Sequence, residues 1–385
     1  MELIFLTINT QVDYFQAFNI FTIDNSKPLS IEVKVEENNS NDVHKFIQNI
    51  YSSFNHIKTK RSCTFPLDSN PYVAGNLKEI IKLRVELNSS NTENNDVEEN
   101  EMVFQEALKN HSKNIADKLL NVQKGYISNN NGASKNPSDG SLIVIFTELK
   151  DSPNKFNFII SKINLELYLD KEESRYRAGL PEKNSIQKSC FIEASYDVES
   201  ENVTFHEIQI ADSNMKIADF WMTSFLELIP ANNDTNNTMN AFTSIKSTIN
   251  RKLRSSSIDR IRLENNLIGY FENNQNFNSE EAIDAIVGDK NFKKNLGISV
   301  KEFKDTLRNL PRDKNFDSSF EIQEASIQNQ FKKTIPLTSS MDLRTKSHIE
   351  DLENKIFSQE DGEGGYELVI KNIDIQTFEN FKKEE

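Results

Sequence analysis

A cluster of basic side chains within residues 246–262 is the feature of this sequence best suited to binding a ligand. Its members are Lys246, Arg251, Lys252, Arg254, Arg260 and Arg262. Asp259 is the one acid in this stretch, so with its six basic residues the stretch has a formal charge of +5, whereas the whole chain has a formal net charge of −14. Lysine and arginine neutralise phosphates, and the serines after Arg254 can donate hydrogen bonds to phosphate oxygens. The cluster therefore predicts a surface that contacts the phosphates of double-stranded DNA.

The same basic residues have a purely structural alternative. The chain has 59 acidic side chains against 45 basic ones, so a basic helix face could simply pair with surplus carboxylates, and exposed pairs of this kind contribute little stability. A second basic run at residues 58–61 follows a predicted helix end, where the helix dipole favours cations. Lys332 and Lys333 form a smaller third run. Neither of these runs is predicted to be the main site.

A metal-dependent nuclease is a remote alternative, indicated by three residues near the N-terminus: Asp24, Glu32 and Lys34. Glu and Lys two residues apart on a strand share one face, and in such nucleases they lie beside an acidic ligand of a divalent metal. Alternating charges on an exposed strand produce the same spacing. We therefore expect a protein that acts by binding and is not an enzyme.

The histidines and cysteines add no catalytic or metal-binding pattern. No histidine has a second His or Cys at the spacing of zinc ligands, and His111 lies on the apolar face of a predicted helix, as a core residue would. Cys63 and Cys190 are too few for a disulfide framework and fit buried thiols in a reducing cytoplasm. We expect neither a metal nor a cofactor.

Composition and charge limit the remaining classes of protein. The hydrophobic fraction is 36%, but 26 phenylalanines supply the apolar surface that a disordered chain would lack. No run approaches the roughly 18 apolar residues of a membrane span, and the N-terminus lacks a secretory pattern, so we expect a soluble cytoplasmic protein. A charge of −14 does not suit DNA binding over the whole surface. It favours an alternative hypothesis, an acidic protein-interaction adaptor without direct DNA contact.

Strand patterns recur along the first 230 residues. The first forty residues read as strands, and Ile31, Val33 and Val35 alternate with charged residues as on a half-buried strand. Further strands are predicted at residues 142–169 (a hairpin), 190–196 and 203–208.

Two long helices are predicted among these strands. The apolar face of the first consists of Val43, Phe46, Ile47, Ile50 and Phe54. The inner stripe of the second consists of Phe104, Leu108, His111, Ile115 and Leu119. Both patterns follow the helical period. Residues 88–101 have many acids and no apolar pattern, so they predict a solvated loop before the second helix.

Residues 216–229 predict a helix in the centre of the core. The polar residues Lys216, Asp219, Thr223 and Glu227 recur at steps of three, four and four. On a helix they form one narrow stripe, and the other positions, including the sole tryptophan Trp221, are apolar. We expect Asp212 or Ser213 to cap this helix and Pro230 to end it.

The remaining patterns divide the chain into three parts. Residues 1–230 predict an α+β N-terminal domain that contains this central helix. Residues 231–238 read as a linker that opens a helical segment, 231–310, which carries the basic cluster. Residues 311–385 predict a small strand–helix–strand region with a turn at 361–365. The fold class expected for the whole chain is α+β.

One segment resembles a known family. Ala218-Asp219-Phe220-Trp221-Met222 is similar to the Ala-Asp-Phe-Phe-Met motif of the bacterial nucleoid-associated (NdpA/YejK-like) proteins, with Lys216 two places ahead as in that family. Residues 331–336 and 364–370 resemble its closing segments in the same order. The resemblance implies a place in the nucleoid, association with double-stranded DNA and with DNA-managing enzymes such as type II topoisomerases. The resemblance is also compatible with a homo-oligomer.

Overall fold

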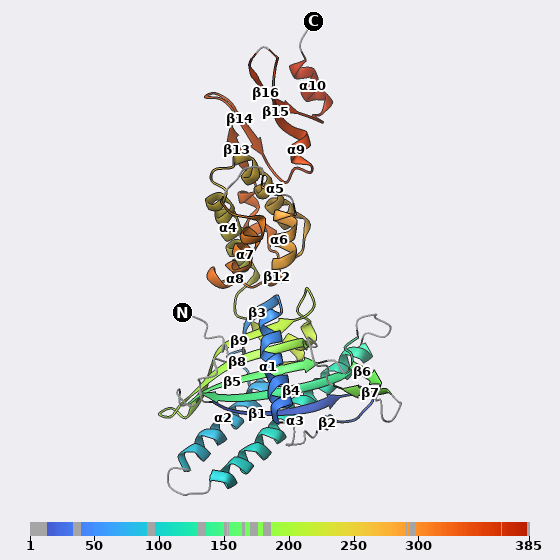
Figure 1. The fold of residues 1–385 in the computed structure, drawn as a ribbon, viewed down its shortest axis with the longest axis vertical. Helices are drawn as coiled ribbons and strands as arrows, with labels where there is room; N and C mark the ends of the chain where they lie inside the picture. Colours follow the sequence, from blue (N-terminus) through green and yellow to red (C-terminus); the bar gives the residue numbers. More distant parts are fainter. Residues whose placement is uncertain are drawn as a thin grey trace. The chain divides into compact units, whose positions relative to one another are not determined.

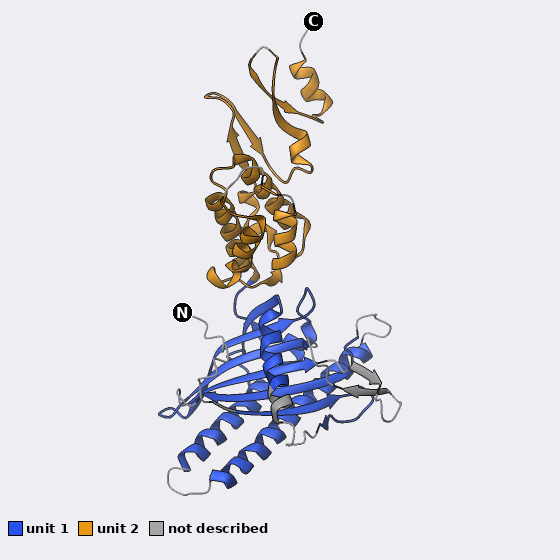
Figure 2. Cartoon of the chain, viewed as in Figure 1, with its two compact units in different colours: residues 1–233 blue, residues 234–385 orange. Residues whose placement is uncertain are grey.

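A computed structural model of the chain describes residues 14–33, 40–90, 97–129, 136–149, 152, 154–163, 166–169, 176–179, 186–289, 291–292, 297–362 and 364–382. The chain forms two compact units, residues 1–233 and 234–385, which Figure 2 colours blue and orange. Unit 1 combines helices with an antiparallel sheet, and unit 2 combines helices with small hairpins. The predicted α+β class is therefore confirmed.

An antiparallel sheet organises unit 1 (Figure 1). Its eight strands, counted over the described residues, are in spatial order β10 (Ile229–Pro230), β3 (Thr59–Thr64), β9 (Asn202–Asp212), β8 (Ile186–Asp197), β5 (Lys155–Ile163), β4 (Gly140–Leu149), β1 (Tyr14–Ile23) and β2 (Ile31–Glu32). A separate small hairpin pairs β6 (Glu166–Leu169) with β7 (Tyr176–Gly179). The predicted hairpin and the two later strands correspond to β4–β5, β8 and β9, which confirms them.

Helices cover both faces of this sheet (Figure 1). On one face, α1 (Ser40–His56) packs against Ile143 and Ile145 of β4. On the other face, α2 (Tyr72–Ser90) and α3 (Val97–Asn129) pack against Val144 and Phe146 of the same strand. Alternate residues of a strand point to opposite faces, so a strand covered on both sides needs an unbroken apolar run. This explains the sequence of β4, which had no alternation to reveal its two faces.

The two long helices confirm their predicted apolar faces. In α1, Ile47, Ile50 and Phe54 are buried, and in α3, Phe104, Leu108, Ile115 and Leu119 are completely buried. The side chain of Val43 lies outside the described residues. His111 is half-buried with its Nδ1 2.9 Å from Asn76 Oδ1, and burial lowers its pKa. It is a hydrogen-bonded core residue, as expected.

Two predictions for unit 1 are wrong in detail. The predicted loop at 88–101 is too long, because α2 continues to Ser90 and α3 already begins at Val97. Ile31 was expected on a buried strand face but is 54% exposed, because β2 comprises only two residues at the edge of the sheet. Residues 34–36 of that predicted strand lie outside the described residues.

The predicted helix at 216–229 is shorter than expected. Only Phe220–Phe225, labelled η2, form a helix, and it is a π-helical turn. Its core placement is nevertheless confirmed, since Trp221 and Phe225 are completely buried. The chain leaves the helix at Glu227, whose φ of 57° lies in the left-handed region. The polar residue Glu227 does not face solvent freely: its carboxylate accepts the N–H of Tyr72, 2.5 Å away, at the start of α2.

Unit 2 contains the helices predicted for the middle of the chain. They are α4 (Asp234–Lys252), α5 (Ser257–Asn273), α6 (Ser279–Val287), α7 (Val300–Arg308) and α8 (Leu310–Asp313). β11 (Asn276–Asn278) pairs with β12 (Ser319–Glu321), and two short 3-10 turns, η3 (Glu324–Ser326) and η4 (Gln328–Gln330), follow. One core, built mainly from isoleucine, leucine and phenylalanine, joins these elements and extends to Phe331. The predicted linker is half wrong, because α4 starts at Asp234 and buries Asn237, which bonds to Asp317.

Two separate ribbons and a last helix follow that core. β13 (Lys333–Pro336) pairs with β14 (Asp342–Thr345), and β15 (Ile356–Glu360) pairs with β16 (Tyr366–Ile370). A short helix, α9 (Leu352–Lys355), precedes β15, and α10 (Ile375–Phe381) follows β16. The turn predicted at 361–365 is confirmed by Gly362 and Gly364, whose φ angles of 83° and 85° suit glycine.

Within the described parts of the chain, no helix combines the length and the apolar character needed to cross a membrane.

Candidate functional site

The basic cluster lies at the corner between α4 and α5 (Figure 1). The four-residue connection is held by two buried residues, Leu253 and Ser256. The N–H of Ser256 donates to the Leu253 carbonyl (3.0 Å), and the Ser256 hydroxyl caps α5 by accepting from the Asp259 N–H. Because these two side chains point inward, Arg254 and Ser255 between them are exposed.

Three of the six predicted cations are exposed at this corner. Arg251 and Lys252 end α4, and Arg254 follows in the connection. We call these three residues the basic corner. Over the described residues, no carboxylate lies within ion-pair distance of any of them. Arg260, in the first turns of α5, is half-exposed. The corner thus presents positive charge to solvent without an internal counter-charge.

The other two predicted cations make internal contacts. Lys246 donates to the carbonyl of Gln330 (3.2 Å) and lies over the ring of Phe242. Arg262 forms an ion pair with Asp259 at 3.3 Å, and the Asp259 side chain is completely buried. The one acid of the segment is therefore withdrawn from the surface together with one of the cations. The structure brings Arg251, Lys252 and Arg254 together and directs Lys246 and Arg262 inward.

Other cations of unit 2 are neutralised by neighbouring acids. Lys304 pairs with Asp284 (2.9 Å), Arg308 pairs with Glu280 (3.0 Å), and Lys333 pairs with Glu264. The two units also differ in charge: residues 234–385 contain 22 basic and 26 acidic side chains, against 23 and 33 in residues 1–233. The basic corner therefore lies in the less acidic unit, where an approaching anion meets less repulsion.

The second basic run, residues 58–61, is built into the sheet. Its last residues belong to β3, where Thr59 is buried and Lys60 lies over the ring of Phe54. Burial lowers the pKa of Lys60 to about 8. Alternation along the strand separates these cations, so they do not form a common surface. In the third run, Lys332 is exposed and Lys333 is held by its acid partner.

The residues of the nuclease alternative do not assemble a metal site in the described part of the chain. Asp24 accepts hydrogen bonds from the hydroxyl and the N–H of Ser26, and these bonds lower the pKa of its carboxyl group. Glu32 is exposed on the two-residue strand β2, and Lys34 lies outside the described residues. Over those residues, no group of three or more His, Cys, Asp or Glu side chains could hold a metal ion.

Neither the two cysteines nor a serine–histidine contact on the sheet forms a catalytic arrangement. Cys63 and Cys190 are buried, and burial raises the pKa of the Cys190 thiol, which makes the thiolate less accessible. Sequence reasoning missed a contact between Ser195 Oγ and His206 Nε2, 2.6 Å apart on the paired strands β8 and β9. Ser195 is half-buried and His206 is exposed, and over the described residues no carboxylate orients the imidazole as a catalytic triad requires.

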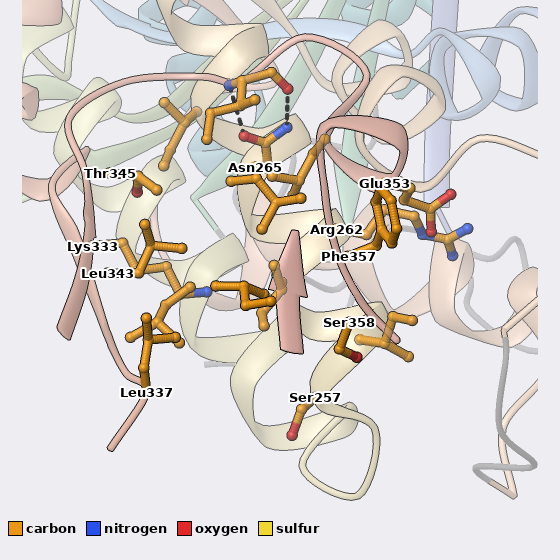
Figure 3. Close-up of a pocket in the computed structure, with 18 of the residues that line it drawn as sticks. Ser257, Arg262, Asn265, Lys333, Leu337, Leu343, Thr345, Glu353, Phe357 and Ser358 are labelled. Atoms are coloured by element: carbon orange, nitrogen blue, oxygen red, sulfur yellow. Dashed lines mark hydrogen bonds between the residues drawn. The ribbon is translucent and has the colours of Figure 1, made fainter. Parts of the chain in front are cut away.

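A pocket of about 450 Å³ in unit 2 was also missed by sequence reasoning (Figure 3). It lies between α5 and the two ribbons, with Leu343 and Phe357 among its apolar lining. Asn265 of α5 forms one wall and is bonded twice to the backbone of Ile349, at 2.9 Å in each direction. The lining residues are spread from Ser257 to Leu368, so no local pattern could reveal the pocket.

Comparison of the chain with protein-family models, with curated proteins and with solved structures found no match. The resemblance to the nucleoid-associated proteins rests on the motif residues alone and stays a prediction.

Proposed function

We propose that this protein binds double-stranded DNA without sequence preference, through the basic corner. The observation that carries the proposal is the exposure of Arg251, Lys252 and Arg254 without a carboxylate partner among the described residues. Cations already paired with acids gain little from a phosphate, whereas solvated ones release the counterions of DNA when they bind.

The geometry of the corner suits phosphates better than bases. Ser255 and Ser257, which are exposed and follow Arg254 in the chain, can add hydrogen bonds to phosphate oxygens. Long basic side chains around a tight connection reach the DNA backbone and carry no base-specific pattern of donors. The surplus acids elsewhere would repel DNA and restrict the contact to this corner.

The family resemblance supports the same function and extends it. Under this proposal the protein is a nucleoid-associated protein of the bacterial cytoplasm, and it acts by binding, without a cofactor. When bound to DNA, the protein would lie beside enzymes that manage DNA topology, such as type II topoisomerases, and would modulate their activity.

The alternative is an acidic adaptor that meets a basic protein and never touches DNA. It is favoured by the charge of unit 1, where acids exceed bases by 33 to 23. A surface of that kind attracts basic partners over several ångströms. This alternative predicts no binding to bare DNA at any salt concentration.

A fluorescence anisotropy titration with a labelled duplex separates the two functions. Three phosphate contacts give a slope of about −2.7 in log affinity against log salt, which is an affinity loss of about 40-fold between about 50 and about 200 mM salt. The triple variant Arg251→Ala/Lys252→Ala/Arg254→Ala should bind weakly and lose nearly all of this salt dependence. Circular dichroism would check that the variant is folded.

A matched control removes the same charge from other exposed positions of unit 2. Lys301→Ala/Lys314→Ala/Lys332→Ala should bind nearly as tightly as the wild-type protein. Equal losses in both triple variants would show that only net charge matters and would remove the assignment to the corner. No wild-type binding even at the lowest salt would overturn DNA binding and leave the adaptor.

A further inference from the structure

The last fifty residues of the described chain have no core of their own. After Phe331, no described side chain is buried. Of the 22 large hydrophobic side chains that are exposed in the described residues, nine lie between Leu337 and Phe381. An isolated two-stranded ribbon is at best marginally stable in water, because it needs a third strand or a packed face. This segment, residues 332–382, contacts α5 through residues such as His348 and Ile349, but most of its large apolar side chains remain uncovered.

The exposed apolar side chains are arranged in two rows. Tyr366, Leu368 and Ile370 alternate along β16, so they share one face of the ribbon, with exposures of 86%, 39% and 41%. Ile375, Phe378 and Phe381 follow at steps of three along α10, so they share one face of the helix, with exposures of 74%, 47% and 82%. Apolar rows of this kind usually pack against other parts of a protein, yet both rows here are exposed to solvent.

The pocket beside α5 continues the first of these rows. Leu368 belongs both to the β16 row and to the pocket lining, and no residue of α10 lines the pocket. The cations at the pocket are already balanced, since Arg262 pairs with Asp259 and Lys333 pairs with Glu264. An anionic ligand would gain little here, whereas apolar side chains would fill the space between Leu343 and Phe357 (Figure 3).

We propose that a second copy of this chain covers this face, with α10 of each copy seated in the pocket of the other. The fit is self-complementary, as a two-fold interface requires, because each copy supplies both the apolar stripe of α10 and the apolar pocket between α5 and the ribbons. Residues 332–382 contain seven basic and ten acidic side chains, so two copies of the segment can meet without strong repulsion. The same near balance gives DNA no attraction to this face.

The two exposed rows supply a substantial part of the area that a stable dimer buries. Tyr366 and Phe381 alone could bury on the order of 300 Å², given their exposures and the size of aromatic side chains. Stable interfaces need about 800 Å² from each partner, and the other residues of the two rows together with the pocket walls add to this area. Arg251, Lys252 and Arg254 do not line the pocket, although Ser257 does, so the interface can be tested separately from the proposed DNA contact.

Sedimentation velocity of the full chain, measured without DNA over a range of protein concentrations, tests the proposal. The wild-type protein should sediment as two chains. Phe378→Glu/Phe381→Glu should sediment as one chain, and because both side chains are exposed in the single copy, its circular dichroism should be unchanged. A matched control, Leu67→Glu/Met239→Glu, places the same charges at exposed apolar positions outside the segment and should remain a dimer.

Mixing two variants distinguishes reciprocal docking from non-specific hydrophobic association. Leu343→Glu puts a charge in the pocket and should also abolish the dimer, while its α10 stays intact. Mixed with the Phe378→Glu/Phe381→Glu variant, it should recover one of the two contacts and form a weaker heterodimer. A wild-type protein that is monomeric at all concentrations, or a dimer that survives both variants, would overturn the proposal, and a different occupant would then cover the face.

Discussion

The ammonium group of Lys188 lies 2.6 Å from the carboxylate of Asp212, and the two side chains are only 7% and 1% exposed. They are direct neighbours on the paired strands β8 and β9. The same Asp212 carboxylate accepts the N–H of Ala218 (3.1 Å), at the start of the segment that resembles the family motif. One buried ion pair therefore connects the sheet to the turn that carries Trp221 into the core.

Breaking this ion pair should destabilise unit 1 strongly. Asp212→Asn leaves the Lys188 ammonium buried without its counter-charge, so the free energy of unfolding should fall by about 3–5 kcal/mol. Urea unfolding of the variant would measure this loss. In the double variant Lys188→Met/Asp212→Asn no charge is stranded, so the loss should be clearly smaller. Equal losses in the single and double variants would show that the pair itself is unimportant.

A second buried lysine predicts a pH dependence. Lys162 on β5 lies opposite Lys188, is 1% exposed, and donates to the Ser138 carbonyl at 2.6 Å. Burial, together with the charge of Lys188, lowers the pKa of Lys162 to about 8 from its usual 10.5. Below pH 8 the folded state bears the full cost of the charged group. Between pH 8 and 10.5 the folded state releases this proton and the unfolded state keeps it, so stability rises with pH.

The variant Lys162→Met isolates this effect, because the other titrations cancel in the comparison. Relative to the variant, the unfolding free energy of the wild-type protein should increase by about 1 kcal/mol from pH 7 to pH 9. Denaturant unfolding at both pH values gives this difference. Lys155→Met, which removes an exposed ammonium from the same strand, is the matched control. A difference between wild type and Lys162→Met that does not change with pH would contradict the prediction.

Close packing of Gly269 predicts an unfavourable glycine-to-alanine substitution in the middle of α5. A Cβ atom on Gly269 would lie 2.6 Å from Nδ1 of His348, whose ring is held by the Asn265 carbonyl at 3.0 Å. Alanine favours a helix by about 1 kcal/mol over glycine, but the clash should outweigh this and make Gly269→Ala destabilising by about 1–3 kcal/mol.

The matched test is a double-mutant cycle measured by thermal or urea unfolding. In a His348→Ala background the ring is gone, so Gly269→Ala should become neutral or slightly stabilising. A Gly269→Ala effect that is the same in both backgrounds would mean that residues near 348 do not pack on α5 as the structure shows.

Local patterns predicted the elements whose partners lie nearby or whose faces are uniform. Phe242, Ile245 and Ile249 follow the helical period within the predicted helical segment 231–310, and all three are buried in α4. The inner stripe of α3 was equally clear from the sequence. These predictions succeeded because a helix that covers a core must repeat its apolar residues at the helical period, whichever surface it meets.

The segment at 216–229 shows where a local pattern fails. Its apolar residues were correctly placed in the core, but the expected long helix is replaced by the six-residue turn η2. The cause lies far away in the sequence: Tyr72, 155 residues from Glu227, donates its N–H to the Glu227 carboxylate, and Lys118 pairs with the same group. These contacts hold Glu227 where the helix has already ended.

The sequence by itself determined the α+β class, the central position of Trp221 and the presence of a basic cluster in an acidic chain, because composition and periodicity are local properties. Only the tertiary structure decided which cations face solvent. Arg251 and Arg254 stay outside, while Lys246 turns to Gln330 and Arg262 to Asp259. The same holds for the pocket beside α5, since its walls come from residues as far apart as Ser257 and Leu368 and exist only when the ribbons pack on the helix.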